Sequence, residues 1–306
     1  MPDALNSSMH LNLRQLEIFR AVAESGSIRA ASRRVHLTQP AVTHAVRELE
    51  RCVGAPLFTR DVKGVIPTDV GEALLRRTHL LFNEVQRMKD EILQVRDGTG
   101  GRLSIAFSSA SAQLLPVALE RFRALRPSVT LDLHEISQPD VDAKMRIGRY
   151  DFAVISDWGE TAYDGLVSDF LFEQPLAVVA RTGHPLAQVR SVSRLQHCTW
   201  LISPGYGLPM LRKIFAAKRL KPPTDVITCQ SAIPLITLLY RTDAVALISG
   251  GRQGLRGAAQ GLTKLPIMGA LDSIRISVIY PEVQALSPAA TVFIDCLRIA
   301  STLPKR

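Results

Sequence analysis

A seven-residue repeat between Thr68 and Arg96 sets the strongest limit on how this chain can fold. With one polar interruption, apolar residues recur there at spacings of four and three: Leu74, Thr78, Leu81, Val85, Met88, Ile92 and Val95. The segment holds no proline, and Thr68 is a good N-cap with Asp69 and Glu72 in the first turn. The pattern predicts one long helix that pairs with another helix. The alternative is a long helix packed on its own domain.

The residues before this helix, 13–66, predict three short helices and a β-hairpin. An apolar face of Leu16, Phe19 and Val22 indicates a first helix that Gly26 ends, and Ser27 caps a second helix over about 28–35. Thr38 is the expected N-cap of a third helix. The inward stripe of that third helix is Val42, Ala45, Val46 and Leu49.

Two helices joined by a tight turn, the second opening with polar side chains, indicate a helix-turn-helix. On the outer face of the third helix, Gln39 can bond a base edge bidentately and Thr43 can meet a thymine methyl or a phosphate. Arg47 can pair with guanine or phosphate, and Pro40 and His44 share the face. The alternative is a merely solvated helix face.

The hairpin that follows favours DNA binding. Residues 56–67 hold two short β-runs around a basic, glycine-containing tip, which predicts a wing. Arg60 and Lys63 are placed to reach phosphate or the minor groove.

Residues 13–72 resemble the N-terminal domain of LysR-type transcriptional regulators. The stretches that carry the resemblance, in register, are Leu16–Ser27, Ala30–Thr43, Leu49–Glu50, Leu57–Arg60 and Pro67–Gly71. Thr38 and Thr43 stand where the family often has serine, and both keep a hydroxyl. The resemblance implies an all-α winged helix-turn-helix domain over residues 11–67, with double-stranded DNA as its partner. It also implies a linker helix over residues 68–97 through which two chains dimerise.

These patterns and the resemblance together give the expected DNA and dimer contacts. The candidate DNA-binding residues are Arg33, Arg34, Thr38, Gln39, Pro40, Thr43, His44, Arg47, Arg60 and Lys63. The candidate dimerisation residues are Leu81, Val85, Met88, Ile92 and Val95. By analogy with the family, the assembly is a homo-oligomer, a tetramer built as a dimer of dimers, with RNA polymerase as a candidate partner.

The remaining 206 residues alternate β-runs with helices, which predicts doubly wound α/β sheets. The β-runs are Leu103–Phe107, Val129–His134, Phe152–Ile155, Pro175–Ala180, Trp200–Ile202, Val226–Thr228, Val245–Ile248 and Ile274–Tyr280. The helices are Ala112–Leu125, Val141–Ile147, Pro209–Arg219, Ala232–Tyr240 and Ala289–Leu303.

Four stretches of this region, Gly101–Phe107, Leu114–Pro116, Phe122–Pro127 and Gly148–Val154, resemble the effector-binding domain of the same family. The resemblance implies two subdomains of periplasmic-binding-protein type within residues 101–306. Subdomain I would hold about 101–170 and 272–306, and subdomain II about 171–271. The chain would cross over near Phe170–Leu171 and return near Leu271–Asp272.

Three loops are candidates for a ligand site, because ligands bind beyond the carboxyl ends of strands and at helix N-termini, which favour anions. The candidate effector-binding residues are Ser108, Ser109, Ser111, Ser203, Pro204, Gly205, Gln230 and Ser231. The alternative for each serine is ordinary helix capping.

The net charge of the C-terminal region indicates the charge of its ligand. The chain has a formal net charge of +9, and residues 101–306, with 23 basic and 16 acidic side chains, carry +7 of it. We therefore expect a small anionic effector, a carboxylate or sulfonate, whose binding changes subunit assembly and DNA bending.

Other classes of protein find little support. The sequence has no G-x-S-x-G, P-loop or G-x-G-x-x-G motif and no C-x-x-C pair, which argues against an enzyme, a cofactor and a metal site. No membrane-spanning run and no secretion signal are apparent, so we expect a cytoplasmic protein. A redox pair of Cys198 and Cys229 stays open. A second alternative also stays open, a DNA-binding regulator whose C-terminal domain only assembles subunits and binds no small-molecule effector.

Overall fold

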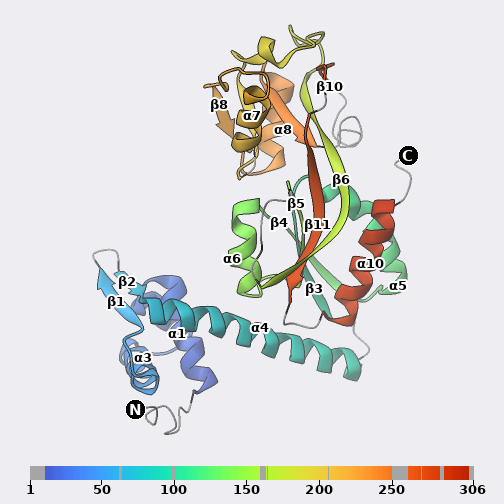
Figure 1. The fold of residues 1–306 in the computed structure, drawn as a ribbon. Helices are drawn as coiled ribbons and strands as arrows, with labels where there is room; N and C mark the ends of the chain where they lie inside the picture. Colours follow the sequence, from blue (N-terminus) through green and yellow to red (C-terminus); the bar gives the residue numbers. More distant parts are fainter. Residues whose placement is uncertain are drawn as a thin grey trace, which may run out of the picture. The chain divides into compact units, whose positions relative to one another are not determined.

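Three helices and a two-stranded hairpin form the first part of the chain in the computed structural model (Figure 1). They are α1 (Leu13–Ser25), α2 (Ile28–Arg34), α3 (Gln39–Val53), β1 (Phe58–Asp61) and β2 (Gly64–Pro67). The structure describes residues 11–61, 64–97, 101–158, 163, 165–205, 207–249, 261–269, 271–282 and 286–302. The chain divides into two compact units, Met1–Lys89 and Asp90–Arg306.

Local sequence signals explain where the first helices begin and end. Ser27 accepts a hydrogen bond from the Ala30 amide, and Thr38 accepts one from the Ala41 amide, both at 3.4 Å. Gly26 ends α1 in the left-handed region, with φ of 60°. These caps confirm the predicted helix-turn-helix.

Helix α4 (Asp69–Asp97) packs its first half on this unit. Phe19, Leu49 and Leu57 form a buried apolar cluster, and Leu74 and Phe82 of α4 pack against it. Thr78, the polar interruption in the repeat, is 1% exposed. The alternative of a helix packed on its own domain therefore holds for the first half of α4.

The second half of α4 keeps an apolar stripe in solvent. Leu81, Met88 and Ile92 are 40%, 53% and 58% exposed, and Val85 is half-buried. Their spacings of seven and four place them on one face of the helix. The side chain of Val95 lies outside the described residues. Within the described residues, no helix is long and apolar enough to cross a membrane.

The second unit is built on one continuous sheet in the strand order β4-β3-β5-β11-β6-β9-β7-β8, with β10 paired to β6. The strands are β3 (Arg102–Phe107), β4 (Thr130–Glu135), β5 (Phe152–Asp157), β6 (Leu166–Arg181), β7 (Trp200–Ile202), β8 (Val226–Thr228), β9 (Val245–Ser249), β10 (Leu262–Lys264) and β11 (Ser273–Pro281). The helices are η1 (Ala112–Leu114), α5 (Leu115–Leu125), η2 (Gln138–Asp140), α6 (Val141–Arg146), η3 (Val192–Leu195), α7 (Gly207–Ala216), α8 (Ala232–Arg241) and α10 (Pro288–Thr302).

Strands β6 and β11 join the two ends of this sheet, as Figure 1 shows. β11 pairs with β6 from Leu166 to Pro175, and β9 pairs with β6 from Leu176 onward. The strand thus runs through the crossover expected at residues 170–171 and changes partner about five residues later. Pro175, which has no N–H to donate, sits where the partner changes. We call the β3, β4, β5 part subdomain I and the β7, β8, β9 part subdomain II.

Helices cover both faces of subdomain I. Phe152 packs with Phe293 of α10 at a ring distance of 5.7 Å, and Phe293 packs with Phe122 of α5 at 4.9 Å. The next strand residue, Ala153, belongs to the opposite cluster with Met145 of α6. This alternation is that of a strand buried on both faces. In subdomain II, Trp200 is fully buried against Phe215 of α7.

One helix begins later than expected. The segment predicted as a helix over Ala112–Leu125 opens with the 3₁₀ turn η1, and α-helix begins at Leu115. Pro116 has no N–H for the α-helical bond to the Ala112 carbonyl, which accounts for the tighter first turn.

Candidate functional site

The outer face of α3 carries the first group of candidate residues. Gln39, Pro40, Thr43, His44 and Arg47 line one shallow, open hollow on this helix. All are exposed except Thr43, which is half-buried and donates its hydroxyl to the Gln39 carbonyl at 2.9 Å. Five residues predicted to contact DNA thus share one open surface.

The predicted basic residues of α2 and α3 differ in whether an acidic side chain pairs with them. Arg47 and Arg33 are exposed, and within the described part of the chain neither has an acidic partner. Arg34 instead forms an ion pair with Glu24, 2.6 Å apart. His44 lies 3.7 Å from Glu48. Among the described residues, Arg33 and Arg47 are therefore not held by an acidic side chain, whereas Thr38 serves as a helix cap.

The predicted wing is present as the β1–β2 hairpin, with Arg60 paired to Val65. The Val65 amide donates to the Gly26 carbonyl at 2.9 Å, which fixes the hairpin against the α1–α2 turn. A side chain at Gly64 would lie 2.5 Å from that carbonyl oxygen, so the close approach requires glycine. Lys63 and the side chain of Arg60 lie outside the described residues.

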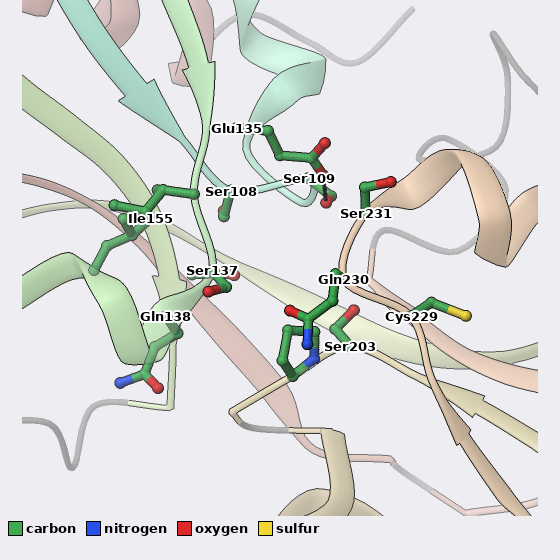
Figure 2. Close-up of a pocket in the computed structure, with 13 residues that line it drawn as sticks. Ser108, Ser109, Glu135, Ser137, Gln138, Ile155, Ser203, Cys229, Gln230 and Ser231 are labelled. Atoms are coloured by element: carbon green, nitrogen blue, oxygen red, sulfur yellow. Dashed lines mark hydrogen bonds between the residues drawn. The ribbon is translucent and has the colours of Figure 1, made fainter. Parts of the chain in front are cut away.

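A small, partly open pocket lies between subdomains I and II (Figure 2). Residues at or just beyond the carboxyl ends of parallel strands supply most of its lining. The lining is Ser108, Ser109, Glu135, Ile136, Ser137, Gln138, Ile155, Ser156, Ser203, Pro204, Cys229, Gln230 and Ser231.

Six of the eight predicted effector-binding residues line this pocket: Ser108, Ser109, Ser203, Pro204, Gln230 and Ser231. Ser111 does not, because it is fully buried and directs its hydroxyl to the Val154 carbonyl at 2.6 Å. Gly205 does not line the pocket either. Its backbone, at φ of 80°, lies against the Gln138–Pro139 turn so closely that a Cβ would meet the Gln138 Oε1 at 2.9 Å.

The sequence prediction missed four polar lining residues, Glu135, Ser137, Gln138 and Ser156. Three of them end or follow β4, so the rule used for the other loops would have found them. Ser156 carried a different signal, since it is a polar residue of β5 directly after the apolar run Phe152–Ile155.

Several polar groups of the pocket already have partners. Ser109 donates to the Glu135 carboxylate, and Ser137 donates to Asp140 at 2.9 Å. Others do not. Ser156 is 1% exposed and its Oγ has no hydrogen-bond partner. Ser231 occupies the N-cap position of α8 without making the side-chain capping bond. The amides of Ala232 and Ile233, the first two residues of α8, also lack a partner within the helix, whereas Pro234 has no N–H.

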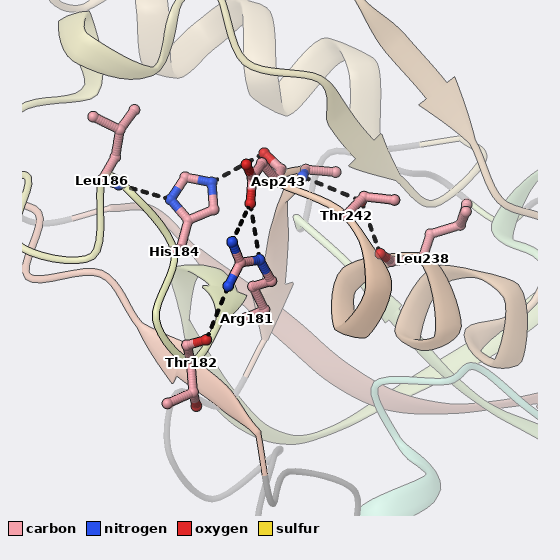
Figure 3. Close-up of polar contacts among 8 residues, drawn as sticks. Arg181, Thr182, His184, Leu186, Leu238, Thr242 and Asp243 are labelled. Carbon is pink, nitrogen blue, oxygen red and sulfur yellow. Dashed lines mark hydrogen bonds and ion pairs between the residues drawn. The ribbon is translucent and has the colours of Figure 1, made fainter.

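A second hollow, in subdomain II, includes His184, Cys198 and Asp243, and Figure 3 shows His184 and Asp243 bonded within the fold. The Leu186 amide donates to His184 Nδ1 at 3.0 Å, so Nε2 carries the proton and donates to the Asp243 carbonyl at 3.0 Å. Arg181 pairs with the Asp243 carboxylate at 2.7 Å. Neither ring nitrogen of His184 is left for a ligand.

The chemistry of the cysteines argues against reactivity. Burial, aided by the charge of Asp243, raises the pKa of the Cys198 thiol, and burial raises the pKa of the Cys229 thiol. Thiols held protonated are poor nucleophiles and poor metal ligands. Both cysteines are free, and no cluster of metal-binding side chains occurs among the described residues.

Two family models match the chain. Residues 13–72 match the bacterial regulatory helix-turn-helix protein of the lysR family, and residues 96–301 match the LysR substrate binding domain. The chain is 30% identical over 301 residues to the Hca operon transcriptional activator HcaR of Escherichia coli, covering 95% of this chain and 99% of that protein. It is 27% identical over 289 residues to the transcriptional regulator GalR of Pseudomonas putida, covering 93% and 73%.

Solved structures show the same fold. The crystal structure of CbnR, a LysR family transcriptional regulator, superposes with a TM-score of 0.70 at 19% identity, covering 95% of this chain and 100% of that one. Full-length CbnR complexed with its target DNA gives a TM-score of 0.68, with the same identity and coverage.

Proposed function

This chain belongs to the LysR family of bacterial transcriptional regulators, and from that premise we propose how it reads DNA and what switches it. It is a DNA-binding regulator with an effector-binding domain, and its named relatives are regulators rather than enzymes. We propose that it binds its operator as a tetramer built from dimers. A small anionic effector, a carboxylate or sulfonate, enters the pocket between subdomains I and II and changes the shape of that assembly on DNA.

The exposed face of α3 supports the proposed role in DNA reading. Gln39 stands in the first turn of the helix, where side chains of a recognition helix meet base edges. Its amide can bond adenine N6 and N7 together. Arg47 lies two turns along, exposed and without an acidic partner among the described residues, and suits guanine or phosphate. Arg33 suits phosphate.

Gln39→Ala should lower sequence discrimination rather than general DNA affinity. A bidentate base contact contributes about 1–3 kcal/mol of discrimination, so operator binding should weaken about 5- to 150-fold while binding to random DNA persists. Titrations on operator and scrambled duplexes at several salt concentrations measure both. Arg33→Ala is the matched comparison. It should weaken both duplexes alike and lower the slope of log K against log salt by about 0.9. Equal losses on both duplexes for Gln39→Ala would rule out base reading by Gln39.

The convergence of three separate loops on one pocket carries the proposal for the effector. Ser109, Ser203 and Ser231 come from segments up to 122 positions apart in sequence, yet all line the same space. The uncapped N-terminus of α8 adds the amides of Ala232 and Ile233 and a positive dipole end, which suits a carboxylate or sulfonate. An effector held by both subdomains favours whichever assembly brings them together.

Ser231→Glu should abolish the effector response and leave operator affinity intact. The added carboxylate would repel an anion at the α8 N-terminus, whereas the residue lies far along the chain from the DNA-binding domain. A reporter assay measures the response, and a gel shift measures operator binding. Ser193→Glu, which adds the same charge at an exposed site outside the pocket lining, is the control. A wild-type response in Ser231→Glu would show that the effector binds elsewhere. If the wild-type protein responds to none of the small acids tested, this result would favour the alternative in which the C-terminal domain only assembles subunits.

A further inference from the structure

The charge of the pocket differs from that of the chain. Among the described residues that line the pocket, Glu135 alone has a formal charge, and none is Lys or Arg. No described cation lies within ion-pair distance of its carboxylate, and its recorded partner is the hydroxyl of Ser109. Figure 2 shows Glu135 and Ser109 together, with Ser231 opposite them. A purely anionic ligand would therefore meet a carboxylate inside its own site.

Ser156 is a second observation, independent of the α8 N-terminus, that favours a ligand in this pocket. Its side chain is 1% exposed, lines the pocket, and has no hydrogen-bond partner for its hydroxyl. Buried hydroxyls nearly always have a partner, because an unsatisfied one destabilises the fold. A polar ligand atom in the pocket would satisfy it. By contrast, the buried Ser111 uses its hydroxyl within the fold.

The pocket favours a negative group at one place and a positive group at another, and one chemical class of ligand carries both. The N-terminus of α8, with Ser231 free of capping, favours a negative group. The Glu135 carboxylate favours a positive hydrogen-bond donor. A ligand with both groups turns the repulsion at Glu135 into attraction.

We propose that the effector is a small zwitterion of the amino-acid class, whose carboxylate meets the α8 N-terminus and whose ammonium pairs with Glu135. The proposal rests on the proposed function of this pocket as the effector site. Glu135 is then the residue that selects amines over simple acids. A hydroxy acid would keep the hydrogen bond but leave the Glu135 charge unbalanced, so we expect it to bind more weakly.

Matched triads of ligands test the proposal on the full chain. Each triad comprises an L-amino acid, the acid that lacks its amino group, and the amine that lacks its carboxylate; leucine, 4-methylpentanoate and isopentylamine form one such set. The twenty common amino acids and their analogues would be screened by thermal melting, and hits measured by calorimetry. We expect at least one amino acid to bind, and both of its analogues to bind about 10- to 100-fold more weakly, since each lacks one charged hydrogen bond.

Glu135→Gln separates this inference from the broader proposal. The variant should bind the amino acid about 10- to 100-fold more weakly and bind the des-amino acid as well as or better than wild type. Glu120→Gln, an exposed site on α5 outside the pocket lining, should change neither affinity. If the des-amino acid binds wild type as tightly as the amino acid, the zwitterion is wrong while the anionic effector stands. Failure of every amino acid to bind would also overturn the inference, and the response of Ser231→Glu would then decide on the pocket itself.

Discussion

Gly71→Ala should remove operator binding by displacing α4 from the helix-turn-helix domain. A Cβ at this position would lie 2.1 Å from the Leu57 carbonyl oxygen and 3.2 Å from the Pro67 Cβ. The first contact is with backbone, which cannot rotate away as a side chain could. The same backbone is held from the other side, because the Thr68 amide donates to the Leu57 carbonyl at 3.0 Å. The helix must therefore shift.

We expect a destabilisation at the upper end of the overpacking range, about 3 kcal/mol or more. That is a large share of the stability of a small domain. Leu74 and Phe82 would lose their fit to the Phe19 and Leu57 cluster, and the domain would melt at lower temperature. Thermal and urea unfolding of the full chain, read with a gel shift on the operator, measure the effect.

Gly54→Ala is the matched control for that prediction. Gly54 ends α3 with φ of 75°, and nothing lies within 4 Å of the Cβ that alanine would add. The change therefore costs only the left-handed conformation, about 1–2 kcal/mol. If the Gly71 and Gly54 variants unfold alike, the Leu57 contact is not what excludes a side chain at Gly71.

The helices of the DNA-binding domain could be predicted closely because the residues that begin and end them act locally. Ser27, Thr38 and Gly26 act within four residues of their own positions, and the caps appear where the sequence places them. The face of Gln39 and Arg47 follows from helical spacing alone. Ion pairing is different. Arg34 forms an ion pair with Glu24, ten positions away in sequence, because of how α1 and α2 pack. The spacing of residues within one helix does not predict such a pair.

The strands of the second unit show the limit of local patterns. Residues 166–181 form one strand only because β11, about a hundred positions later, pairs along the first part of it. In the sequence alone, the polar residues Asp169 and Glu173 interrupt the apolar pattern that would predict a strand. The strand continues through the expected crossover at residues 170–171, and its partner changes from β11 to β9 after Pro175.

The ligand pocket could be predicted as far as the carboxyl-end rule was applied. Applied after β3, β7 and β8, the rule indicated the loops that the structure brings together. It was not applied after β4, and Glu135, the residue that bears most on ligand charge, was missed. Ser111 illustrates the opposite error, because a serine in the right loop can still turn its hydroxyl inward to a strand carbonyl. Sequence does not distinguish the two orientations.

The largest effect on assembly is expected from Met88→Glu combined with Ile92→Glu. These side chains are 53% and 58% exposed on the apolar stripe of α4, where nothing in the described part of this chain covers them. If two copies of α4 pair along the stripe, each added carboxylate is buried without a partner, which destabilises the pair by about 3–5 kcal/mol. The doubly substituted chain should therefore sediment as a monomer at concentrations where wild type is a dimer or tetramer.

Loss of the pair should also remove tight operator binding, since a dimer holds two half-sites at once and a monomer holds one. The monomer should remain folded, because the cluster around Phe19 and Leu57 involves the first half of α4 and keeps its residues. Circular dichroism checks this. Gln86→Glu adds the same carboxylate to the same helix outside the seven-residue repeat, so it should leave both assembly and operator affinity unchanged. An unaltered sedimentation coefficient for Met88→Glu with Ile92→Glu would mean that the chains assemble through another surface.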